Sequence, residues 1–408
     1  MKRCTPLVAA LTALTLAVVA PVAPAKDAPA AAAPAARIAA PPVDQPLIQL
    51  AILLDTSNSM DGLIDQAKRQ LWTIVNQFVA VQRDGRRPLL QVALFEYGND
   101  GLAAAENHIR LVLPLTDDLD KVSQELFALK TNGGQEYCGA VVKAAVDRLT
   151  WSKKKDDLKV IFIAGNEPFS QGPINYSESC KAAITRGIQV NTIFCGAEAE
   201  GIATKWKDGA VLADGRFMSI DQNTQVVQIE TPFDKEIAEL GVKINETFVA
   251  YGKQAQAGAQ NQAIQDANAA ELSPQSAAGR AVTKGSANYR NSMWCLVDAV
   301  YLDNVDLAKV KEEDLPENMR KMNMEERKAH LAEKKKQREA IAKQIKDLDA
   351  KRQTYIIAEQ QKLAEAGIET FDKAVIDSVR KQAEAKKFEF IEPKSPSETA
   401  PQDAPKQK

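Results

Sequence analysis

The stretch Leu50-Ala51-Ile52-Leu53-Leu54-Asp55-Thr56-Ser57-Asn58-Ser59 joins a run of apolar residues to a short polar loop. Apolar residues begin at Leu47 and continue almost without interruption to Leu54, which is typical of a strand covered on both faces in a parallel sheet. The strand ends at Asp55, where a carboxylate and two hydroxyl groups follow within five residues.

Helical and strand patterns alternate after this loop. A helix is predicted over 61–81, because apolar residues recur there at intervals of three and four. Further strands are predicted at 90–97, 109–114, 160–164, 188–194 and 215–221, and further helices at 141–149, 177–186 and 224–251. This order predicts an α/β fold with a doubly wound, mostly parallel, Rossmann-like sheet flanked by helices. In such sheets ligands bind beyond the carboxyl ends of the strands, where Asp55 lies.

The pattern Asp-x-Ser-x-Ser places the oxygen donors of Asp55, Ser57 and Ser59 on one tight loop. Hard oxygen ligands suit magnesium, manganese or calcium ions. Ser and Asp also form turns and cap helices, so Ser59 or Asp61 could instead cap the following helix. The five residues alone leave both interpretations open.

Residues 50–60 resemble the opening of the von Willebrand factor A (VWA) family, in which this loop builds a metal-ion-dependent adhesion site. The resemblance covers roughly residues 47–250 and continues through Thr131-Asn132-Gly133-Gly134, which is similar to the second metal loop. It implies that Asp55, Ser57 and Ser59 bind a divalent cation directly or through water, and that Thr131 is the matching ligand of the second loop. The expected cation is Mg²⁺, with Mn²⁺ or Ca²⁺ as alternatives. An open coordination position would accept a carboxylate from a protein or peptide partner.

The third metal loop departs from the family pattern. The family usually has Thr-Asp-Gly after its fourth core strand, whereas here the strand leads to Ala164-Gly165-Asn166-Glu167-Pro168, and Gly165 takes the Asp position. Asn166 or Glu167 could supply the missing oxygen, and Glu167 is favoured because a carboxylate offsets the charge of a dication. Alternatively, Glu167 only begins a turn before Pro168.

The rim of the expected site is assigned to residues after the second loop. Glu136 and Tyr137 are expected to line it, whereas Tyr97, Asn99 and Asp100 would do so only if their hairpin bends toward it. A rim Tyr offers contact area to a partner, although Tyr is also common as a half-buried sheet residue.

The two ends of the chain have compositions that differ from the middle. A basic start at Met1-Lys2-Arg3 and an apolar run over 7–20 predict an export signal over 1–25, so the mature protein is expected to be periplasmic or secreted. The apolar run is shorter than the roughly 20 residues of a spanning helix, so no transmembrane anchor is expected in the mature chain. Residues 26–46 predict a disordered Ala/Pro-rich tether, and 392–408 a disordered tail.

The cysteines of the predicted mature chain are Cys138, Cys180, Cys195 and Cys295. An even number in an oxidising compartment favours disulfides, with buried thiols as the alternative. No CxxC spacing occurs, so a zinc or redox motif has little support.

The region after the expected VWA-like domain (47–250) divides into two parts. Residues 251–322 are interpreted as a connector, loosely packed over 252–290 and carrying a short docked helix within 289–305. Residues 323–391 predict charged helices, the first capped by Asn323 and Glu326 and the second over 368–388.

The first of these helices carries an apolar seam with the spacing of a coiled coil. The seam consists of Leu331, Ile341, Ile345, Leu348 and Tyr355, and is interrupted by Lys334, Arg338 and Arg352. Because charged seam residues weaken a coiled coil, self-association through 323–391 and a helical hairpin packed on another part of the protein both stay open.

Composition and motifs narrow the classes of function. The chain has 52 Lys and Arg against 54 Asp and Glu, a formal net charge of -2, so no nucleic-acid partner is expected. The only histidines, His108 and His330, are far apart, and no phosphate-binding glycine motif follows a strand, so no enzyme is expected. The sequence predicts an exported, non-catalytic recognition or adhesion module. The alternative is a metal-free scaffolding protein that assembles through its helical C-terminal region.

Overall fold

A computed structural model describes residues 45–60, 64, 68, 72–78, 81–220, 229–365 and 371–390 of the 408-residue chain. The predicted signal peptide, nearly all of the predicted tether and the predicted tail lie outside these residues. Within the described residues, no helix is both long and apolar enough to span a bilayer.

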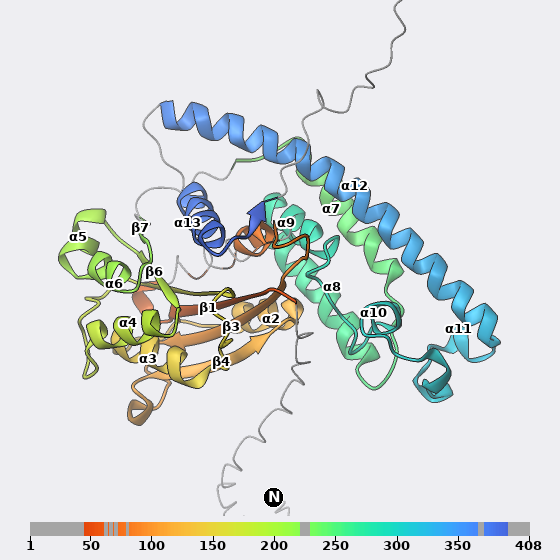
Figure 1. Ribbon diagram of the computed structural model, residues 1–408, viewed down its shortest axis with the longest axis horizontal. Coiled ribbons are helices and arrows are strands. Elements are labelled where there is room, and N and C mark those ends of the chain that lie inside the picture. Colours follow the sequence, from red (N-terminus) through yellow and green to blue (C-terminus); the bar gives the residue numbers. More distant parts are fainter. Residues whose placement is uncertain are drawn as a thin grey trace, which may run out of the picture. The chain divides into compact units, whose positions relative to one another are not determined.

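A six-stranded sheet with the strand order β4-β3-β1-β5-β6-β7 forms the centre of the fold (Figure 1). Its strands are β1 (Leu47–Asp55), β3 (Leu89–Tyr97), β4 (Ile109–Thr116), β5 (Leu158–Gly165), β6 (Gln189–Phe194) and β7 (Phe217–Ser219). All neighbouring pairs are parallel except β3 and β4. The prediction of a mostly parallel α/β sheet is confirmed.

Strand β1 lies inside the sheet and is buried along its whole length. Its side chains alternate: Leu50 and Ile52 belong to one apolar core, and Ala51 and Leu53 to the other. The first core also contains residues of α2 (Leu119–Ala128) and α13 (Phe371–Ala385), and the second contains residues of α3 (Cys138–Arg148), α4 (Tyr176–Thr185) and α6 (Trp206–Leu212). Burial on both faces explains the unbroken apolar run of β1.

The remaining elements connect the strands or follow the sheet. They are α5 (Glu198–Ala203), α7 (Asp234–Lys243), α8 (Ala255–Leu272), α9 (Pro274–Lys284), α10 (Leu296–Tyr301), α11 (Glu317–Arg320), α12 (Met324–Glu365), the 3₁₀ turns η1 (Asn58–Met60), η2 (Ala104–Glu106), η3 (Ile244–Thr247), η4 (Leu307–Lys309) and η5 (Glu312–Asp314), and the short pair β2 (Val81–Gln82) and β8 (Glu389–Phe390). The helix predicted over 61–81 is helical at its described positions 64, 68 and 72–77.

The segment 252–290 differs from its prediction as a loosely packed connector, because it forms the helices α8 and α9. Ser273 caps α9 by accepting a hydrogen bond from the Ser276 amide, and Pro274 occupies the first turn, where its missing N–H costs nothing. Few large apolar residues are needed, because polar side chains of both helices are buried with hydrogen-bond partners.

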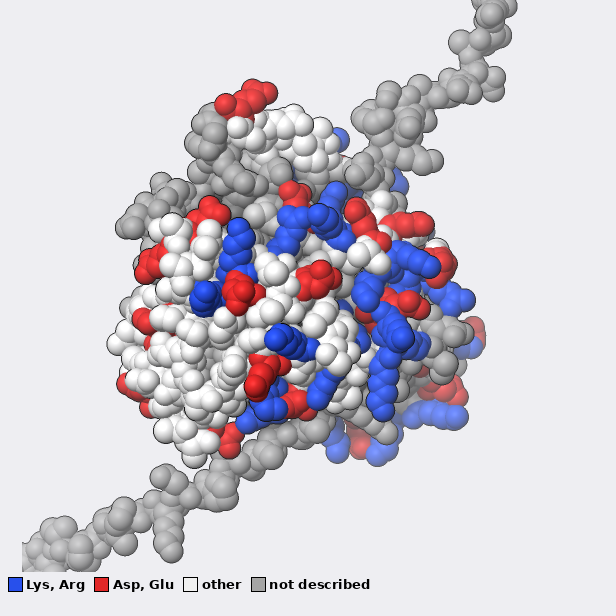
Figure 2. All heavy atoms as spheres, turned by 60° about the vertical axis from the view of Figure 1, so that its left-hand side comes forward, with Lys and Arg blue, Asp and Glu red and all other residues white. Residues whose placement is uncertain are grey.

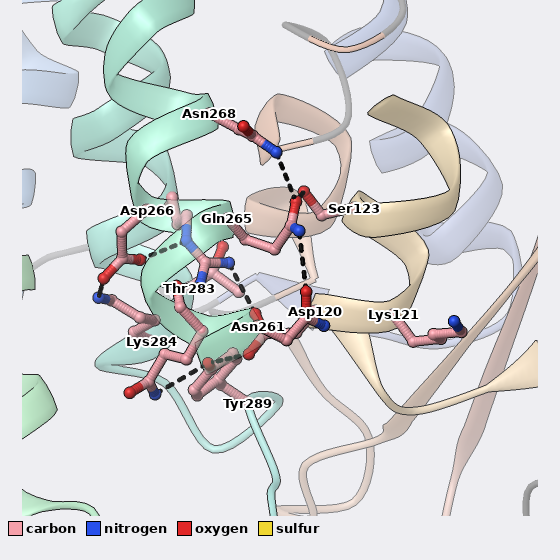
Figure 3. Close-up of polar contacts among 12 residues, drawn as sticks. Asp120, Lys121, Ser123, Asn261, Gln265, Asp266, Asn268, Thr283, Lys284 and Tyr289 are labelled. Atoms are coloured by element: carbon pink, nitrogen blue, oxygen red, sulfur yellow. Dashed lines mark hydrogen bonds and ion pairs between the residues drawn. The ribbon is translucent and has the colours of Figure 1, made fainter. Parts of the chain in front are cut away.

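An ionic network joins α8 and α9 to α2 (Figure 3). The guanidinium of Arg280 pairs with Asp120 of α2 at 2.8 Å and with Asp266 of α8. Lys284 pairs with Asp266 at 2.6 Å, and the Tyr289 hydroxyl donates to Asp120. We refer to these five residues as the Arg280 network.

The long helix α12 packs on other helices of the same chain. Its seam residues Leu331, Ile341 and Ile345 are buried in two apolar clusters shared with α7, α9 and α10. The charged seam residues also contact the chain itself: Arg338 pairs with Asp298, Arg352 pairs with Asp234 at 2.6 Å, and the Lys334 amine donates to the Glu246 carbonyl. Of the two predicted arrangements, the helix packed on another part of the protein is the one observed, although α13 packs on the sheet and not as a hairpin partner.

Helix α13 lies far from the sheet in sequence but packs against it. Val375, Val379 and Phe388 join the first apolar core, and Gln382 exchanges hydrogen bonds with Asn191 of β6. The C-terminal helical region therefore contributes to the covering of the sheet.

The cysteines of the described residues are buried and form no disulfide with one another: Cys138, Cys180, Cys195 and Cys295. The expectation of disulfides is not met, and the alternative of buried thiols is the one observed. Desolvation raises the pKa of all four, which keeps the groups neutral and apolar in character.

Figure 2 shows charged residues of both signs on this face of the molecule. Lys and Arg gather in its right-hand part with Asp and Glu among them, and further Asp and Glu are scattered along the left-hand edge. This face therefore presents no field of a single sign.

Candidate metal centre

Four loops meet at the carboxyl edge of the sheet around the end of β1. The parallel register places Asp55 opposite Tyr97 of β3, and Leu54 opposite Ala164 of β5. The Thr56 amide donates to the Tyr97 carbonyl at 2.9 Å, and the Asn132 amide donates to the Thr56 carbonyl at 3.0 Å. The loops after β1, β3, α2 and β5 are thus held together by backbone contacts and strand pairing.

Asp55 is completely buried, and its two carboxylate oxygens have different surroundings. Oδ1 accepts a hydrogen bond from the Ser57 amide at 2.8 Å. Oδ2 has no hydrogen-bond partner among the described residues. Desolvation, and then the charges of Glu136 and Glu167, raise the pKa of Asp55 to about 7. A buried acceptor of this kind is costly unless some other group binds it.

The hydroxyls of Ser57 and Ser59 lie 2.8 Å apart, as the Asp-x-Ser-x-Ser pattern predicts for converging donors. The Ser59 hydroxyl donates to Oδ1 of Asn166 at 3.1 Å, so the third loop reaches the pair through Asn166. Residues 61–63 are not described, so the alternative in which Ser59 or Asp61 caps the next helix falls outside the described residues.

The third loop has no room for a side chain at position 165. A Cβ at Gly165 would lie 2.5 Å from the Tyr97 hydroxyl and 3.2 Å from Oδ2 of Asp55. Tyr97 is buried, and its hydroxyl donates to the Ala164 carbonyl at 3.0 Å. The phenol therefore borders the position from which the family's third-loop Asp would extend.

Glu167, which the sequence favours over Asn166, is half-buried near the other carboxylates. Its carbonyl accepts a hydrogen bond from Trp206 at 2.8 Å, which fixes the path of the loop. Its charge raises the pKa of both Asp55 and Glu136. Asn166 contacts the hydroxyl pair, whereas Glu167 acts on the centre through its charge.

The second loop brings two different residues near Asp55. Thr131 is half-buried beside the first loop, since its neighbour Asn132 bonds to Thr56. Glu136, which the sequence assigns to the rim, is only 7% exposed and lies inside the centre. Its Oε2 accepts from Gln171 at 3.3 Å, and desolvation and the charge of Glu167 raise its pKa. Gln171 belongs to no sequence motif, so nothing in the sequence indicates that it contacts Glu136.

Tyr137, which the sequence assigns to the rim, precedes helix α3. It is half-buried, its hydroxyl donates to Gln135 at 3.2 Å, and its ring packs edge-on against His108 with centroids 6.2 Å apart. Gly172, with a φ of +98°, packs against the Tyr137 ring, and a Cβ at this position would lie 2.5 Å from the ring.

The hairpin after β3 does bend toward the centre. Gly98 has a φ of +76°, and a Cβ there would lie 2.6 Å from Oδ1 of Asp55. Asn99 donates to the Lys130 carbonyl at 3.0 Å, and the Asp100 amide donates to the Gly133 carbonyl. The hairpin therefore closes the centre on the β3 side, and glycine is required at position 98 by both conformation and space.

The donors gathered here are carboxylate, hydroxyl and amide oxygens. Within the part of the chain that the structure describes, no group of three or more His, Cys, Asp or Glu side chains is placed to hold a metal. A cation at this centre would therefore depend on Ser57 and Ser59 as well as on carboxylates. An all-oxygen donor set beside an unpartnered buried carboxylate oxygen fits a hard dication.

Residues 49–208 match the family model of the von Willebrand factor type A domain. This part of the chain is a VWA domain, and the resemblance expected from the sequence is confirmed.

Three solved structures illustrate its similarity to known proteins. The conserved hypothetical protein BatB from Bacteroides thetaiotaomicron is 17% identical, with 43% of this chain and 90% of that chain covered and a TM-score of 0.33. The VWA domain of SpRpn10 is 17% identical, with 44% and 90% covered and a TM-score of 0.34. Proximal thread matrix protein 1 from the mussel byssus, with a zinc-occupied MIDAS motif, is 15% identical, with 43% and 42% covered and a TM-score of 0.34. No curated protein matches the chain.

Proposed function

We propose that the protein is a non-catalytic recognition module in which a divalent cation completes a binding site for a protein or peptide carboxylate. The observation that carries the proposal is the buried Oδ2 of Asp55, which has no hydrogen-bond partner among the described residues and belongs to the same loop as the converging hydroxyls of Ser57 and Ser59. Metal binding would satisfy this oxygen and offset the cost of its burial.

Asp55, Ser57 and Ser59 would hold the cation, with Asn166 in contact with the hydroxyl pair and Thr131 nearby in the second loop. Mg²⁺ is the preferred cation because every donor is a hard oxygen, and Mn²⁺ or Ca²⁺ could replace it. The bound dication would supply an open position for a carboxylate of the partner. Tyr137 and Gln135 stand at the rim, where they could contact that partner.

A recognition role without catalysis is supported by the chemistry around the centre. His108 packs against the Tyr137 ring, and His330 lies on α12, so the two histidines of the chain cannot act as a pair. Export to the periplasm or the exterior belongs to the same proposal, through the predicted signal over 1–25, and cell fractionation of the tagged full chain tests it.

The central experiment measures thermal unfolding with EDTA and with saturating Mg²⁺, Mn²⁺ or Ca²⁺. A ligand that binds only the folded state stabilises it by about 2.7 kcal/mol at 100 times its Kd. Asp55→Ala is expected to abolish the shift in Tm. Asp156→Ala, which removes an exposed carboxylate from the loop before β5, is the matched control and is expected to keep it.

Partner binding is tested on an immobilised peptide array that pairs each Asp or Glu peptide with its Asn or Gln counterpart. Retention of the acidic peptides only, lost with EDTA and in Asp55→Ala, supports the proposal. If no cation raises the Tm of the full chain, the proposal is wrong.

The metal-free scaffold is the alternative function, and the packing of α12 gives it less support. Leu331, Ile341 and Ile345 face the chain's own helices, whereas Tyr355 and Ile357 of the same helix are 38% and 53% exposed. A chain that ignores cations but forms dimers in light scattering, and returns to a monomer on Ile357→Lys, would favour the scaffold.

A further inference from the structure

Glu136 lies against Asp55 in the interior of the metal centre. Both side chains border the space that a side chain at Gly98 would fill. A Cβ at this position would be 2.6 Å from Oδ1 of Asp55 and 2.8 Å from Cγ of Glu136. Glu136 is only 7% exposed. The second loop therefore places the Glu136 side chain in the interior of the centre, near that of Asp55.

The first loop and Gln171 flank these two side chains. The Ser57 amide donates to Oδ1 of Asp55 at 2.8 Å, and the Ser57 hydroxyl lies 2.8 Å from that of Ser59. Glu136 is held by Gln171, whose amide donates to Oε2 at 3.3 Å. The Glu136 side chain is thus oriented by a hydrogen-bonded neighbour, as a metal ligand with a supporting partner would be.

A second observation indicates a missing ligand. Oδ2 of Asp55 is buried without a hydrogen-bond partner among the described residues, and Oδ1 of Asp55 and Cγ of Glu136 both lie within 3 Å of the space that a Gly98 Cβ would fill. Like charges that are buried close together repel, and a bound dication would turn this repulsion into attraction.

We propose that Glu136 is a direct ligand of the cation and replaces the carboxylate that the third loop cannot supply. This inference rests on the proposed function. Position 165 has no room for a side chain because a Cβ there would lie only 2.5 Å from the Tyr97 hydroxyl, so the second negative charge comes from the second loop. Asp55 and Glu136 together then neutralise the dication, and Ser57 and Ser59 complete the oxygen set.

The experiment titrates Mg²⁺ and Mn²⁺ into the full chain by isothermal calorimetry and compares Glu136→Gln with Glu167→Gln as the matched control. Loss of a supporting partner costs roughly 10- to 100-fold in metal affinity, so loss of a direct carboxylate ligand is expected to cost at least about 100-fold. Glu167→Gln is expected to change the affinity by less than about 10-fold. Tm in EDTA checks that both variants fold.

A change of ligand chemistry separates a direct ligand from a positioning residue. Glu136→Cys is expected to bind Cd²⁺ tightly while losing Mg²⁺, because thiolates prefer soft metals, and Glu167→Cys is expected to show no such exchange. If the wild-type chain binds no cation, the proposed function fails together with this inference. If the wild-type chain binds cations and Glu136→Gln binds them equally well, or only Glu167→Gln loses them, this inference alone is overturned.

Discussion

Two groups of buried carboxylates in this protein have opposite surroundings. In the Arg280 network, Asp120 and Asp266 are paired with a guanidinium and an amine, and Tyr289 adds a hydrogen bond (Figure 3). At the end of β1, Asp55 and Glu136 are buried near each other around Gly98, and their hydrogen-bond donors are the Ser57 backbone amide and the Gln171 side-chain amide. The first group has its counter-charges built in, and the second lacks them.

Under the proposed function, this difference separates a structural role from a binding role. Paired charges in the Arg280 network connect three helices and leave no place for a ligand. The carboxylates at the end of β1 store unfavourable free energy in the metal-free protein, because burial raises the pKa of both. A site that is destabilising until it is filled is expected for a ligand-dependent module.

The largest expected effect comes from breaking the paired group. Arg280→Ala removes the charged partner of the buried Asp120, whereas Asp266 keeps Lys284, and uncompensated buried charge typically costs about 3–5 kcal/mol. The free energy of unfolding, measured in urea, is expected to fall by that amount. Arg290→Ala, which breaks a partly exposed pair with Asp303, is the control and is expected to cost at most about 1 kcal/mol. Equal losses in the two variants would contradict a structural role for the network.

A change of the opposite sign in the free energy of unfolding is expected for a substitution at the end of β1. Asp55→Asn is predicted to stabilise the metal-free protein above pH 7, by at most about 4 kcal/mol, since one pKa unit corresponds to about 1.4 kcal/mol. The pKa of Asp55 rises from 3.8 to about 7 on folding. Between these values the folded state retains a proton that the unfolded state has lost, so the free energy of unfolding falls as pH increases.

Urea unfolding in EDTA at pH 5 and pH 8 measures this effect. Wild type is expected to lose stability between the two pH values, and Asp55→Asn to lose less. A destabilised Asp55→Asn at pH 8 would show that the carboxylate is as well compensated as those of the Arg280 network.

The smallest effect concerns the closed third loop. Gly165→Ala places a Cβ 2.5 Å from the Tyr97 hydroxyl and is expected to cost about 1–3 kcal/mol, as overpacking does. Tyr97→Phe removes that hydroxyl, so the double variant is expected to lose less than the sum of the two single losses. Additive losses in a double-mutant cycle of urea unfolding would mean that Tyr97 does not close position 165.

Local patterns predicted the mostly parallel sheet and the close approach of the Ser57 and Ser59 hydroxyls. The apolar run of β1 and the donors of Asp55, Ser57 and Ser59 are adjacent in sequence, so spacing alone placed them. Glu136 was expected at the rim and lies inside, because its inward path depends on Gly98 and Gln171, which come from other loops. The sequence favoured Glu167 over Asn166 because of its charge. In the structure Asn166 is the residue that contacts the Ser59 hydroxyl, because the path of the backbone brings it there.

The helical half of the chain shows the same limit on a larger scale. Residues 252–290 have few core-forming side chains. Arg280 is nevertheless buried, because it pairs with Asp120, which lies 160 residues earlier in the sequence. Periodicity cannot reveal such a pair, since each residue alone is typical of a surface.

By itself the sequence determined the class of fold and the first-loop donors, because both depend on neighbours along the chain. Only the tertiary structure decided which charges are compensated. Asp120 pairs with Arg280, and Asp55 lies near Glu136, because distant segments of the chain pack together. Burial then makes the sign of each neighbouring charge decisive, because electrostatic interactions strengthen as water is excluded.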